Sequence, residues 1–405
     1  MKGQMILLAA MACLVSCREP MTELTDRVFD RAEVQFKAMD ARLADGMFPK
    51  SLKNGECFDT PRQNDWVSGF FPGSLWYVYQ YTGDEEFRAL AEKHTAKLEG
   101  ICDNVTHHDI GFQVNCSYGN AYRIAGDTAA LATYESAAAK LATRFSPVVG
   151  CIKSWDNKKY VYPVIIDNMM NLELLVRAAD LFSCDSLREI AVTHALTTMK
   201  NHFREDNSTF HLVDYDPETG AVSRKITVQG YADPTSWSRG QAWGLYGYTM
   251  MYELTKDGRF LSQAEKIAAY VLPLLPKDGV PYWDFNAPGT PNAVAADAPG
   301  CPKKYEWKEG EPVLRDASAG AIIASALVNL STLSPDKAAS KRYVKTAEKI
   351  IRTLASPEYL AEPGENGDFL LKHSVGNLHG NSEVDVPLTY ADYYYLEALL
   401  RYKAL

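Results

Sequence analysis

One carboxylate stands in an apolar stretch of this chain. Asp167 follows three branched apolar residues in the segment YPVIIDNMMNLELL, and methionines and leucines come soon after it. A charged carboxylate is costly to bury without a partner, and a low local dielectric raises its pKa towards the range that a general acid needs. Asp167 is therefore a candidate proton donor. The local pattern leaves one alternative open, a helix-start carboxylate that bonds free backbone N–H groups.

A second acidic candidate lies in the segment THHDIGFQVN. Asp109 could be the second carboxylate of an active site, or the residue of an Asx-turn before a helix. His107 and His108 precede it, but three consecutive residues cannot all point at one ion without a strained loop. No other metal-ligand spacing accompanies them. We therefore expect neither a metal nor a cofactor.

Aromatic, cationic and amide side chains complete the set. A sugar acid needs aromatic faces for its ring, an arginine for its carboxylate and a carboxyl group for proton transfer. Several such residues stand at or just before the predicted inner helices, and the others lie in the loops that lead to them. The candidates for substrate binding are Trp66, Trp155, His211, Gln229, Trp237, Arg239 and Trp243.

A repeated unit positions these residues. Each unit has a helix that is apolar nearly all round, a short Gly/Asp turn, and a second helix with charges on one face. The clearest copies are residues 69–98, 120–145, 165–203, 240–275 and 317–354, and residues 388–405 form the first half of a sixth. An all-apolar helix is expected inside and an amphipathic helix outside. The segment HLVDYDPETGAVSRKITV is predicted to be a strand pair inserted before an inner helix.

Six helical hairpins allow an open solenoid or a closed double ring. Reference residues of successive units are 49 to 77 residues apart, which lacks the even spacing that is usual in a solenoid. The last hairpin lacks a second helix, and a helix at residues 22–39 could supply it by closing the ring. We therefore predict an all-α fold, an (α/α)6 barrel, in one catalytic domain at residues 22–405.

The N-terminus has the pattern of an exported lipoprotein. Lys2 precedes an apolar run at residues 5–15 that is too short to span a bilayer. The run ends in Leu14-Val15-Ser16-Cys17, which resembles a bacterial lipobox. We expect a signal peptide at residues 1–16, lipidation of Cys17, a linker at residues 17–21, and a location in the periplasm or on the outer membrane. The alternatives are an ordinary signal peptide and a ragged N-terminus.

Composition limits the partners. The formal charge is −9 and no block of Lys and Arg appears, which argues against nucleic-acid binding. No later segment reaches about 18 uninterrupted apolar residues, so a membrane contact is expected only through the lipid. The sequence does not indicate an oligomeric state.

Seven motifs in order resemble a known family. They are WVSGFFPGSLWYVYQYTGD, HHDIGFQ, IIDNMMNLELL, SWSRGQAWGLYGY, PYWDFNAP, RDASAGAI and YADYYYLEALLR. The chain from about residue 22 to its end is similar to glycoside hydrolase family 88, the unsaturated glucuronyl hydrolases. The resemblance implies an (α/α)6 barrel that removes the 4,5-unsaturated uronic acid from the non-reducing end of lyase-generated, glycosaminoglycan-type oligosaccharides.

The resemblance also implies roles for the candidates. Asp167 would be the general acid/base that hydrates the enol ether, and Asp109 the second catalytic carboxylate. His211, Gln229 and Arg239 match positions around the uronate, and the three tryptophans that match aromatic walls are Trp155, Trp237 and Trp243.

Other functions remain open at this stage. The related unsaturated rhamnogalacturonyl hydrolases share the fold and the chemistry, but their segment after the arginine resembles WARGNGW rather than SWSRGQAW. A non-catalytic glycan-binding lipoprotein would also explain the lipobox and the tryptophans. A conventional glycosidase for saturated uronides is a further alternative.

Overall fold

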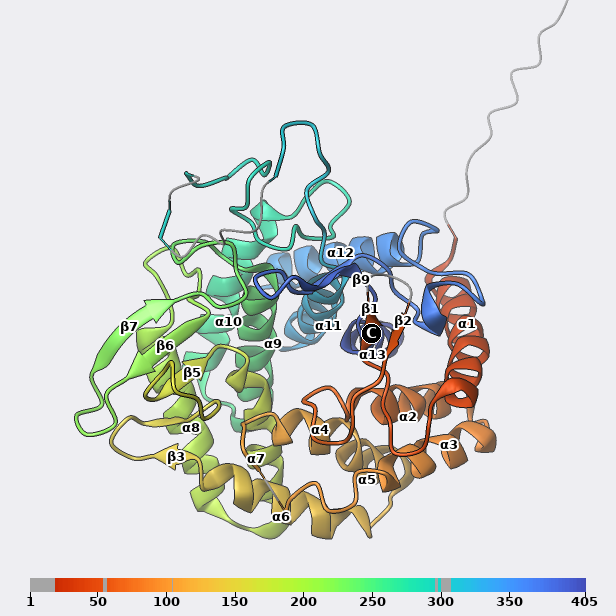
Figure 1. Cartoon of the computed structure of the whole chain (residues 1–405), viewed down its shortest axis with the longest axis horizontal. Coiled ribbons are helices and arrows are strands. Elements are labelled where there is room, and N and C mark those ends of the chain that lie inside the picture. Colours follow the sequence, from red (N-terminus) through yellow and green to blue (C-terminus); the bar gives the residue numbers. More distant parts are fainter. Residues whose placement is uncertain (1–18, 54–56, 104, 296–297, 300–306) are drawn as a thin grey trace, which may run out of the picture.

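The computed structural model describes residues 19–53, 57–103, 105–295, 298–299 and 307–405. The predicted lipidation site, Cys17, lies outside these ranges. None of the helices in the described ranges is both long and apolar enough to cross a bilayer. Figure 1 shows the chain as a ring of helices with short strands at one side and across the middle.

Two concentric sets of helices build the ring. The inner positions are taken by α2 (Phe70–Thr82), α4 (Ile110–Cys116) with α5 (Tyr118–Ala125), α7 (Asn168–Phe182), α9 (Ser238–Thr255), α11 (Ala317–Leu333) and α13 (Thr389–Lys403). The outer positions are taken by α3 (Glu85–Ala96), α6 (Ala130–Ala142), α8 (Asp185–Asn201), α10 (Gly258–Val271), α12 (Lys337–Leu354) and α1 (Met21–Arg42).

The inner ring closes on itself. Each inner helix packs against the next, and α13 packs against both α11 and α2. The N-terminal α1 packs against α2 and α13 and so takes the outer place that the last hairpin lacks. The predicted (α/α)6 barrel and its closure by the N-terminal helix are confirmed.

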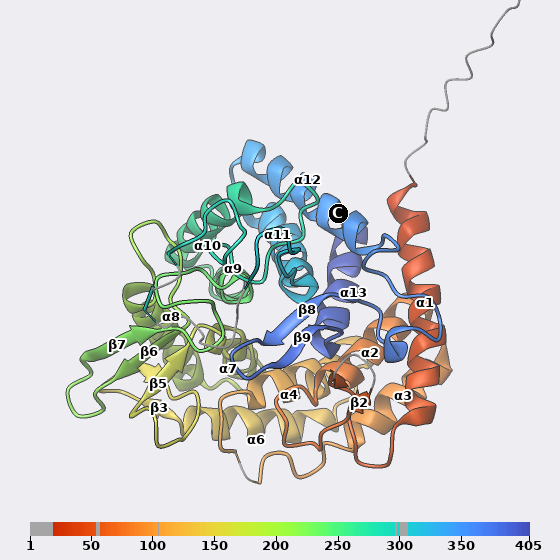
Figure 2. The same cartoon turned by 45° about the horizontal axis from the view of Figure 1, so that its top comes forward.

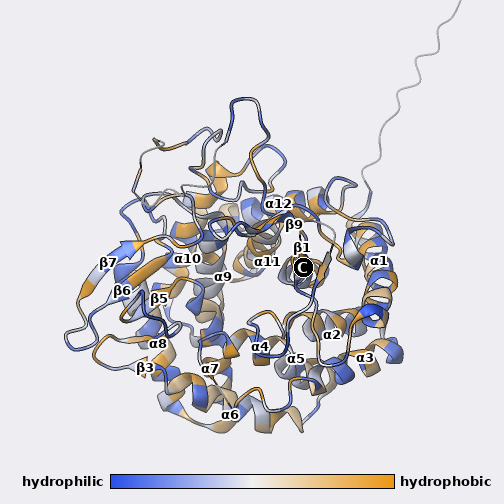
Figure 3. Cartoon of the chain, in the orientation of Figure 1, coloured by the Kyte–Doolittle hydropathy of each residue, from blue (hydrophilic) through white to orange (hydrophobic). Residues whose placement is uncertain are grey.

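Burial follows the predicted division between inner and outer helices. In α9 every residue from Ser238 to Met251 is buried, whereas in α12 the buried residues recur three or four positions apart. Figure 3 shows the blue, hydrophilic residues mainly on the outer helices and loops. Aspartates begin several outer helices, and the side chain of Asp336 accepts hydrogen bonds from the first turn of α12.

Short strands lie in the loops at the starts of the inner helices. The predicted pair is present as β6 (Leu212–Tyr215) and β7 (Val222–Ile226), and β5 (Pro163–Ile165) extends it to three strands. The pair β8 (Ser374–Asn377) and β9 (Ser382–Val386) crosses in front of the inner helices in Figure 2. The remaining pairs are β1 (Ser51–Lys53) with β2 (Cys57–Asp59) and β3 (Phe145–Ser146) with β4 (Cys151–Ile152).

The second inner position differs from the prediction. Its helix begins at Ile110, ten residues before the start of the predicted unit at residues 120–145, and it breaks at Ser117 into α4 and α5. The hydroxyl group of Ser117 donates to the carbonyl oxygen of Gln113 (2.5 Å), and the backbone at Ser117 leaves the helical region. Asp109 therefore stands at a true inner-helix start, like Asp167.

Close packing of the inner helices depends on glycines. A Cβ atom on Gly247 of α9 would lie 2.6 Å from the Cβ atom of Met169 in α7. That atom cannot move without its helix, so the two helices approach at this distance only because position 247 has no side chain.

We expect the substitution Gly247→Ala to destabilise the protein by about 1–3 kcal/mol, because overpacking forces α9 away from α7. Denaturant unfolding followed by circular dichroism measures the change. The matched control is Gly258→Ala at the start of α10, where an added Cβ meets nothing within 4 Å. Equal stability of the two variants would contradict the role of close packing at Gly247.

Candidate active site

The starts of the inner helices surround a cavity of about 270 Å³. Seven of the nine predicted catalytic and substrate-binding residues line it, and they come from widely separated parts of the chain. Three further residues, which the sequence did not single out, complete the wall. The lining residues are Trp66, Asp109, Trp155, Ile165, Asp167, His211, Val228, Gln229, Arg239 and Asn377.

Asp167 stands directly before α7 but does not cap it. Its side chain makes no capping hydrogen bond, so the alternative of a helix-start carboxylate that bonds backbone N–H groups is not what the structure shows. Its Oδ2 atom is shielded from solvent and has no hydrogen-bond partner within the described part of the chain. Burial raises the pKa of Asp167 to about 7; Arg239 opposes this rise and Asp109 adds to it.

His211 faces Asp167 as a neutral donor. Its Nδ1 atom accepts hydrogen bonds from the backbone N–H groups of Val228 (3.0 Å) and Gln229 (3.1 Å). A ring nitrogen that accepts carries no proton, so in the neutral ring the proton is on Nε2. That nitrogen lies 3.8 Å from Oδ2 of Asp167, and burial and then Arg239 lower the pKa of His211 well below its usual value. An N–H donor therefore points at the group that carries the candidate proton.

Asp109 is the second carboxyl group of the cavity, and its pKa is lowered instead of raised. Its oxygens lie 3.3 Å from Nδ1 of His107 and 3.3 Å from Nε2 of His108. Burial raises the pKa of Asp109, but His108, His107 and then Asn171 outweigh it and hold this pKa below the usual value. The cavity thus contains one carboxyl group with a lowered pKa, Asp109, and one with a raised pKa, Asp167. In such a pair one group carries the negative charge while the other can hold the proton of a general acid.

A close contact between α4 and α7 brings the two aspartates to one cavity. A Cβ atom on Gly111 would lie 2.7 Å from the Cα atom of Asn171, so only glycine fits there. Asn171 joins the two helices, because its Oδ1 atom accepts from the backbone N–H of Phe112 (2.8 Å) and its Nδ2 atom donates to Asp109 (3.5 Å). Gly111, the glycine of the segment HHDIGF, is therefore required by the close packing of α4 against α7.

Arg239 lines the cavity, but its guanidinium group already donates hydrogen bonds to other parts of the protein. Its guanidinium group donates to Asp316 (2.9 Å) and to the carbonyl oxygens of Val375 and Gly376 in β8. Gln229 also donates to the carbonyl oxygen of Gly376 (3.1 Å). These contacts fasten the β8–β9 hairpin over the cavity, in addition to any contact with a substrate.

The tryptophans divide into two groups. Trp66 and Trp155 line the cavity. Trp237 and Trp243 are 3% and 0% exposed and are not among the lining residues. Trp237 packs against His211 with 4.6 Å between ring centroids, so the structure places it behind the wall instead of at the sugar face.

Sequence reasoning missed Asn377, Ile165 and Val228. Ile165 and Val228 are apolar residues of the strand insertion, and Asn377 lies in β8, in a segment without a catalytic motif. The signal for the predicted residues was a charged, amide, imidazole or indole side chain at an inner-helix start or in the loop that leads to it. Ile165 and Val228 lack such a side chain, and Asn377 lies in a segment that matched no motif.

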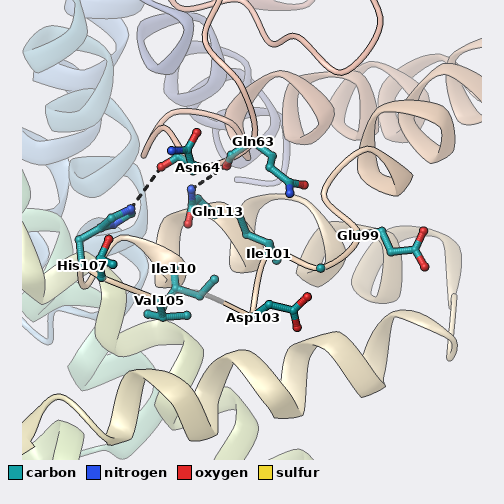
Figure 4. Close-up of a pocket in the computed structure, with 11 residues that line it drawn as sticks. Gln63, Asn64, Glu99, Ile101, Asp103, Val105, His107, Ile110 and Gln113 are labelled. Carbon is teal, nitrogen blue, oxygen red and sulfur yellow. Dashed lines mark hydrogen bonds between the residues drawn. The ribbon is translucent and has the colours of Figure 1, made fainter.

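A second cavity of about 370 Å³ lies beside the first, on the other side of His107. Figure 4 shows Glu99, Asp103 and two glutamines around it. It is lined by two carboxylates, and neither Lys nor Arg is among its described lining residues, so it suits an anionic sugar poorly. The smaller cavity, with Asp167 and Arg239, has the better chemistry for a uronic acid.

Comparison with known proteins identifies the family. The model of Glycosyl Hydrolase Family 88 matches residues 41–278. An unsaturated glucuronyl hydrolase of Formosa agariphila is 42% identical over 87% of this chain and 84% of its own length. An unsaturated chondroitin disaccharide hydrolase of Streptococcus agalactiae is 32% identical over 96% of both chains.

A solved structure gives the same result. An unsaturated glucuronyl hydrolase specific for heparin superposes with a TM-score of 0.86 and 45% identity, and the match covers 94% of this chain and 97% of that one. The family that the sequence motifs predicted is confirmed: the chain belongs to glycoside hydrolase family 88.

Proposed function

We propose that this chain removes the 4,5-unsaturated uronic acid from the non-reducing end of lyase-generated glycosaminoglycan oligosaccharides, with Asp167 as the proton donor. The observation that carries this proposal is the pair of carboxyl groups in one cavity, Asp167 with a pKa of about 7 and Asp109 with a lowered pKa. The names of the similar proteins, which include a chondroitin disaccharide hydrolase and a heparin-specific enzyme, support the substrate class.

The reaction is the hydration of an enol ether. The carboxylic acid of Asp167 gives its proton to C4 of the C4=C5 double bond, and positive charge develops on C5 and the ring oxygen. The Asp167 carboxylate then takes a proton from water as the water oxygen bonds to C5. The resulting hemiketal opens to a ketone at C5, and the hemiacetal left at C1 expels the neighbouring sugar. One water is consumed, and the acid returns to its protonated state.

The surrounding residues fit this sequence of events. Asp109 favours the protonated form of Asp167 because it is a neighbouring negative charge. The Nε2–H of His211 is a buried donor without a protein partner in the described ranges, so we assign it to the substrate. Trp66 and Trp155 offer apolar faces to the sugar ring. Rules for ordinary glycosidases, which need a nucleophile or base opposite an acid at the anomeric carbon, do not apply here.

Other substrates are less well supported. The similar proteins reported above are named for glucuronyl or chondroitin disaccharide hydrolysis, which favours these uronides over rhamnogalacturonyl compounds. A purely glycan-binding role would not account for two carboxyl groups with oppositely shifted pKa values in one cavity.

The cellular location is a separate proposal. We propose that Cys17 is lipidated after removal of residues 1–16 and that the enzyme is exported and held on a membrane in the periplasm or at the outer membrane. The support is the segment Leu14-Val15-Ser16-Cys17 after an apolar run. Because α1 begins at Met21, the folded barrel would follow the anchor after a few residues.

The catalytic proposal predicts the behaviour of Asp167→Asn. Unsaturated disaccharides from heparin and chondroitin lose their ultraviolet absorbance when the double bond is hydrated, and this loss measures turnover. We expect the wild-type protein to act on at least one of them and Asp167→Asn to lose about 10²–10⁴-fold in kcat. A wild-type protein inactive on every unsaturated uronide would refute the function, and an active Asp167→Asn would refute the role of this residue.

Stability provides a control for the same variant. The folded-state pKa of Asp167, about 7, is above its usual value of 3.8, so the folded wild type binds the proton more tightly and loses stability as pH rises from about 4 to 7. Asn carries no such charge. Asp167→Asn should therefore gain in melting temperature relative to the wild type at pH 8 more than at pH 4.

The pH profile tests Asp109. Activity of the wild type should fall as pH rises through about 7, because Asp167 then loses the proton that it must donate. Asp109→Asn removes a neighbouring negative charge, so the pKa of Asp167 falls and the alkaline limb of kcat/KM moves to lower pH. The matched control is Asp392→Asn, because Asp392 also has a buried carboxyl group with a pKa of about 7 but bonds two backbone N–H groups of Leu370 and Leu371 outside the cavity. If the alkaline limb moved in Asp392→Asn but not in Asp109→Asn, Asp167 would not be the group whose titration sets this limb.

The lipid proposal predicts that Cys17→Ser abolishes labelling with radioactive palmitate and releases the protein from the membrane fraction. Turnover of the released protein should equal that of the wild type, because the substitution lies outside the barrel. Palmitate labelling that persists in Cys17→Ser would contradict lipidation at this position.

A further inference from the structure

A buried ion pair lies at the mouth of the barrel, beside the candidate catalytic acid. Arg239 at the start of α9 is 1% exposed and Asp316 directly before α11 is 0% exposed. Nη1 of Arg239 donates to Oδ2 of Asp316 over 2.9 Å. The Proposed function assigns no role to Asp316.

The ion pair is part of the fastening of β8. Besides Asp316, the guanidinium group donates from Nη1 to the carbonyl oxygen of Val375 (2.5 Å) and from Nη2 to that of Gly376 (2.9 Å). Three of its five N–H groups thus donate to protein acceptors, which fixes the plane of the guanidinium group. Because Asn377 follows in β8 and lines the cavity, the orientation of Arg239 determines where this wall lies.

Asp316 is held rigidly for this contact. Its Oδ1 atom accepts from the backbone N–H (3.0 Å) and the hydroxyl group (2.5 Å) of Ser318, and from the backbone N–H of Ala319 (3.3 Å). One oxygen therefore caps α11 while the other, Oδ2, faces Arg239. The same helix start also holds the residue before β8, because the backbone N–H of Ala317 donates to the carbonyl oxygen of His373 (2.9 Å).

The charge of Asp316 bears on the protonation of Asp167. The charged and titratable groups that face Asp167 are Arg239, Asp109, His211 and Tyr390. The groups that face Arg239, besides Asp167, are Asp316, Tyr390, Glu383 and His211. A buried guanidinium group without its counter-ion would favour the ionised form of a carboxyl group nearby. Asp316 supplies that counter-ion at hydrogen-bond distance, and Arg239 does not form an ion pair with Asp167.

We propose that Asp316 is a positioning residue for the reaction, which acts through Arg239. It holds the guanidinium group and β8 over the cavity, and it offsets a positive charge that would otherwise draw Asp167 into its ionised, inactive form. This inference rests on the proposed function, in which Asp167 must carry a proton.

The test is the pH profile of Asp316→Asn on an unsaturated disaccharide that the wild type hydrolyses. Asparagine keeps the size of the side chain and can still cap α11, but it removes the counter-ion. We expect kcat/KM to fall by about 10- to 100-fold and the alkaline limb to move to lower pH. The matched control is Asp336→Asn, because Asp336 caps α12 through the same kind of contacts, to Ala338 and Ala339, and its charge is felt by Arg342 without an ion pair. Its alkaline limb should coincide with that of the wild type.

A second comparison separates positioning from a general loss of structure. In an Arg239→Gln background the charge on which Asp316 acts is absent, so adding Asp316→Asn should produce a smaller shift of the limb than in the wild type. If Asp316→Asn alone fails to fold, Ser318→Ala serves in its place, because it removes the hydroxyl group that holds Oδ1 of Asp316, and its alkaline limb should move in the same direction by a smaller amount. An unmoved limb in Asp316→Asn, or an equal shift in both backgrounds, would overturn the inference. A wild type that hydrolyses no unsaturated disaccharide would instead refute the proposed function.

Discussion

A carboxyl group shielded from water and left without a hydrogen-bond partner loses free energy whenever it ionises. Asp167 approaches this situation, since its Oδ2 atom is buried and has no hydrogen-bond partner in the described part of the chain, and burial raises its pKa to about 7. Two features of the barrel maintain that condition. The inner helices exclude water, and α7 begins beside Asp167 without taking its side chain as a cap. The barrel therefore keeps a substantial fraction of this acid protonated near neutral pH.

Arg239, the cationic group beside the acid, donates its hydrogen bonds to other partners. Arg239 lowers the pKa of Asp167, and a direct ion pair would ionise the acid permanently. Instead the guanidinium group binds Asp316 and two carbonyl oxygens of β8. Glu383, which has a raised pKa because it is buried, lies on β9 of the same hairpin. The cavity can therefore attract an anionic sugar while its acid stays neutral.

Regular patterns made the barrel predictable, and long-range packing limited the rest. The spacing of apolar residues identified inner and outer helices, and Gly83 and Gly126 end inner helices in the left-handed conformation as their turns required. The break at Ser117 was missed because it depends on one side-chain contact to Gln113. Three-residue β5 was missed because so short a strand forms only against β6.

The site was predictable where chemistry coincides with an inner-helix start, as for Asp167 and Arg239. Trp243 satisfies the same rule, yet it packs against Phe112 and Tyr394 and is fully buried. The reason is helical geometry: residues four positions apart on one helix lie about one turn apart, so Trp243 is one turn deeper than Arg239. Asn377 is the opposite case: it does not begin an inner helix, yet the β8–β9 hairpin places it in the wall of the cavity. An amino-acid pattern specifies which residues begin a helix, but the depth of each side chain and the loops that cross the mouth are set by the closed ring.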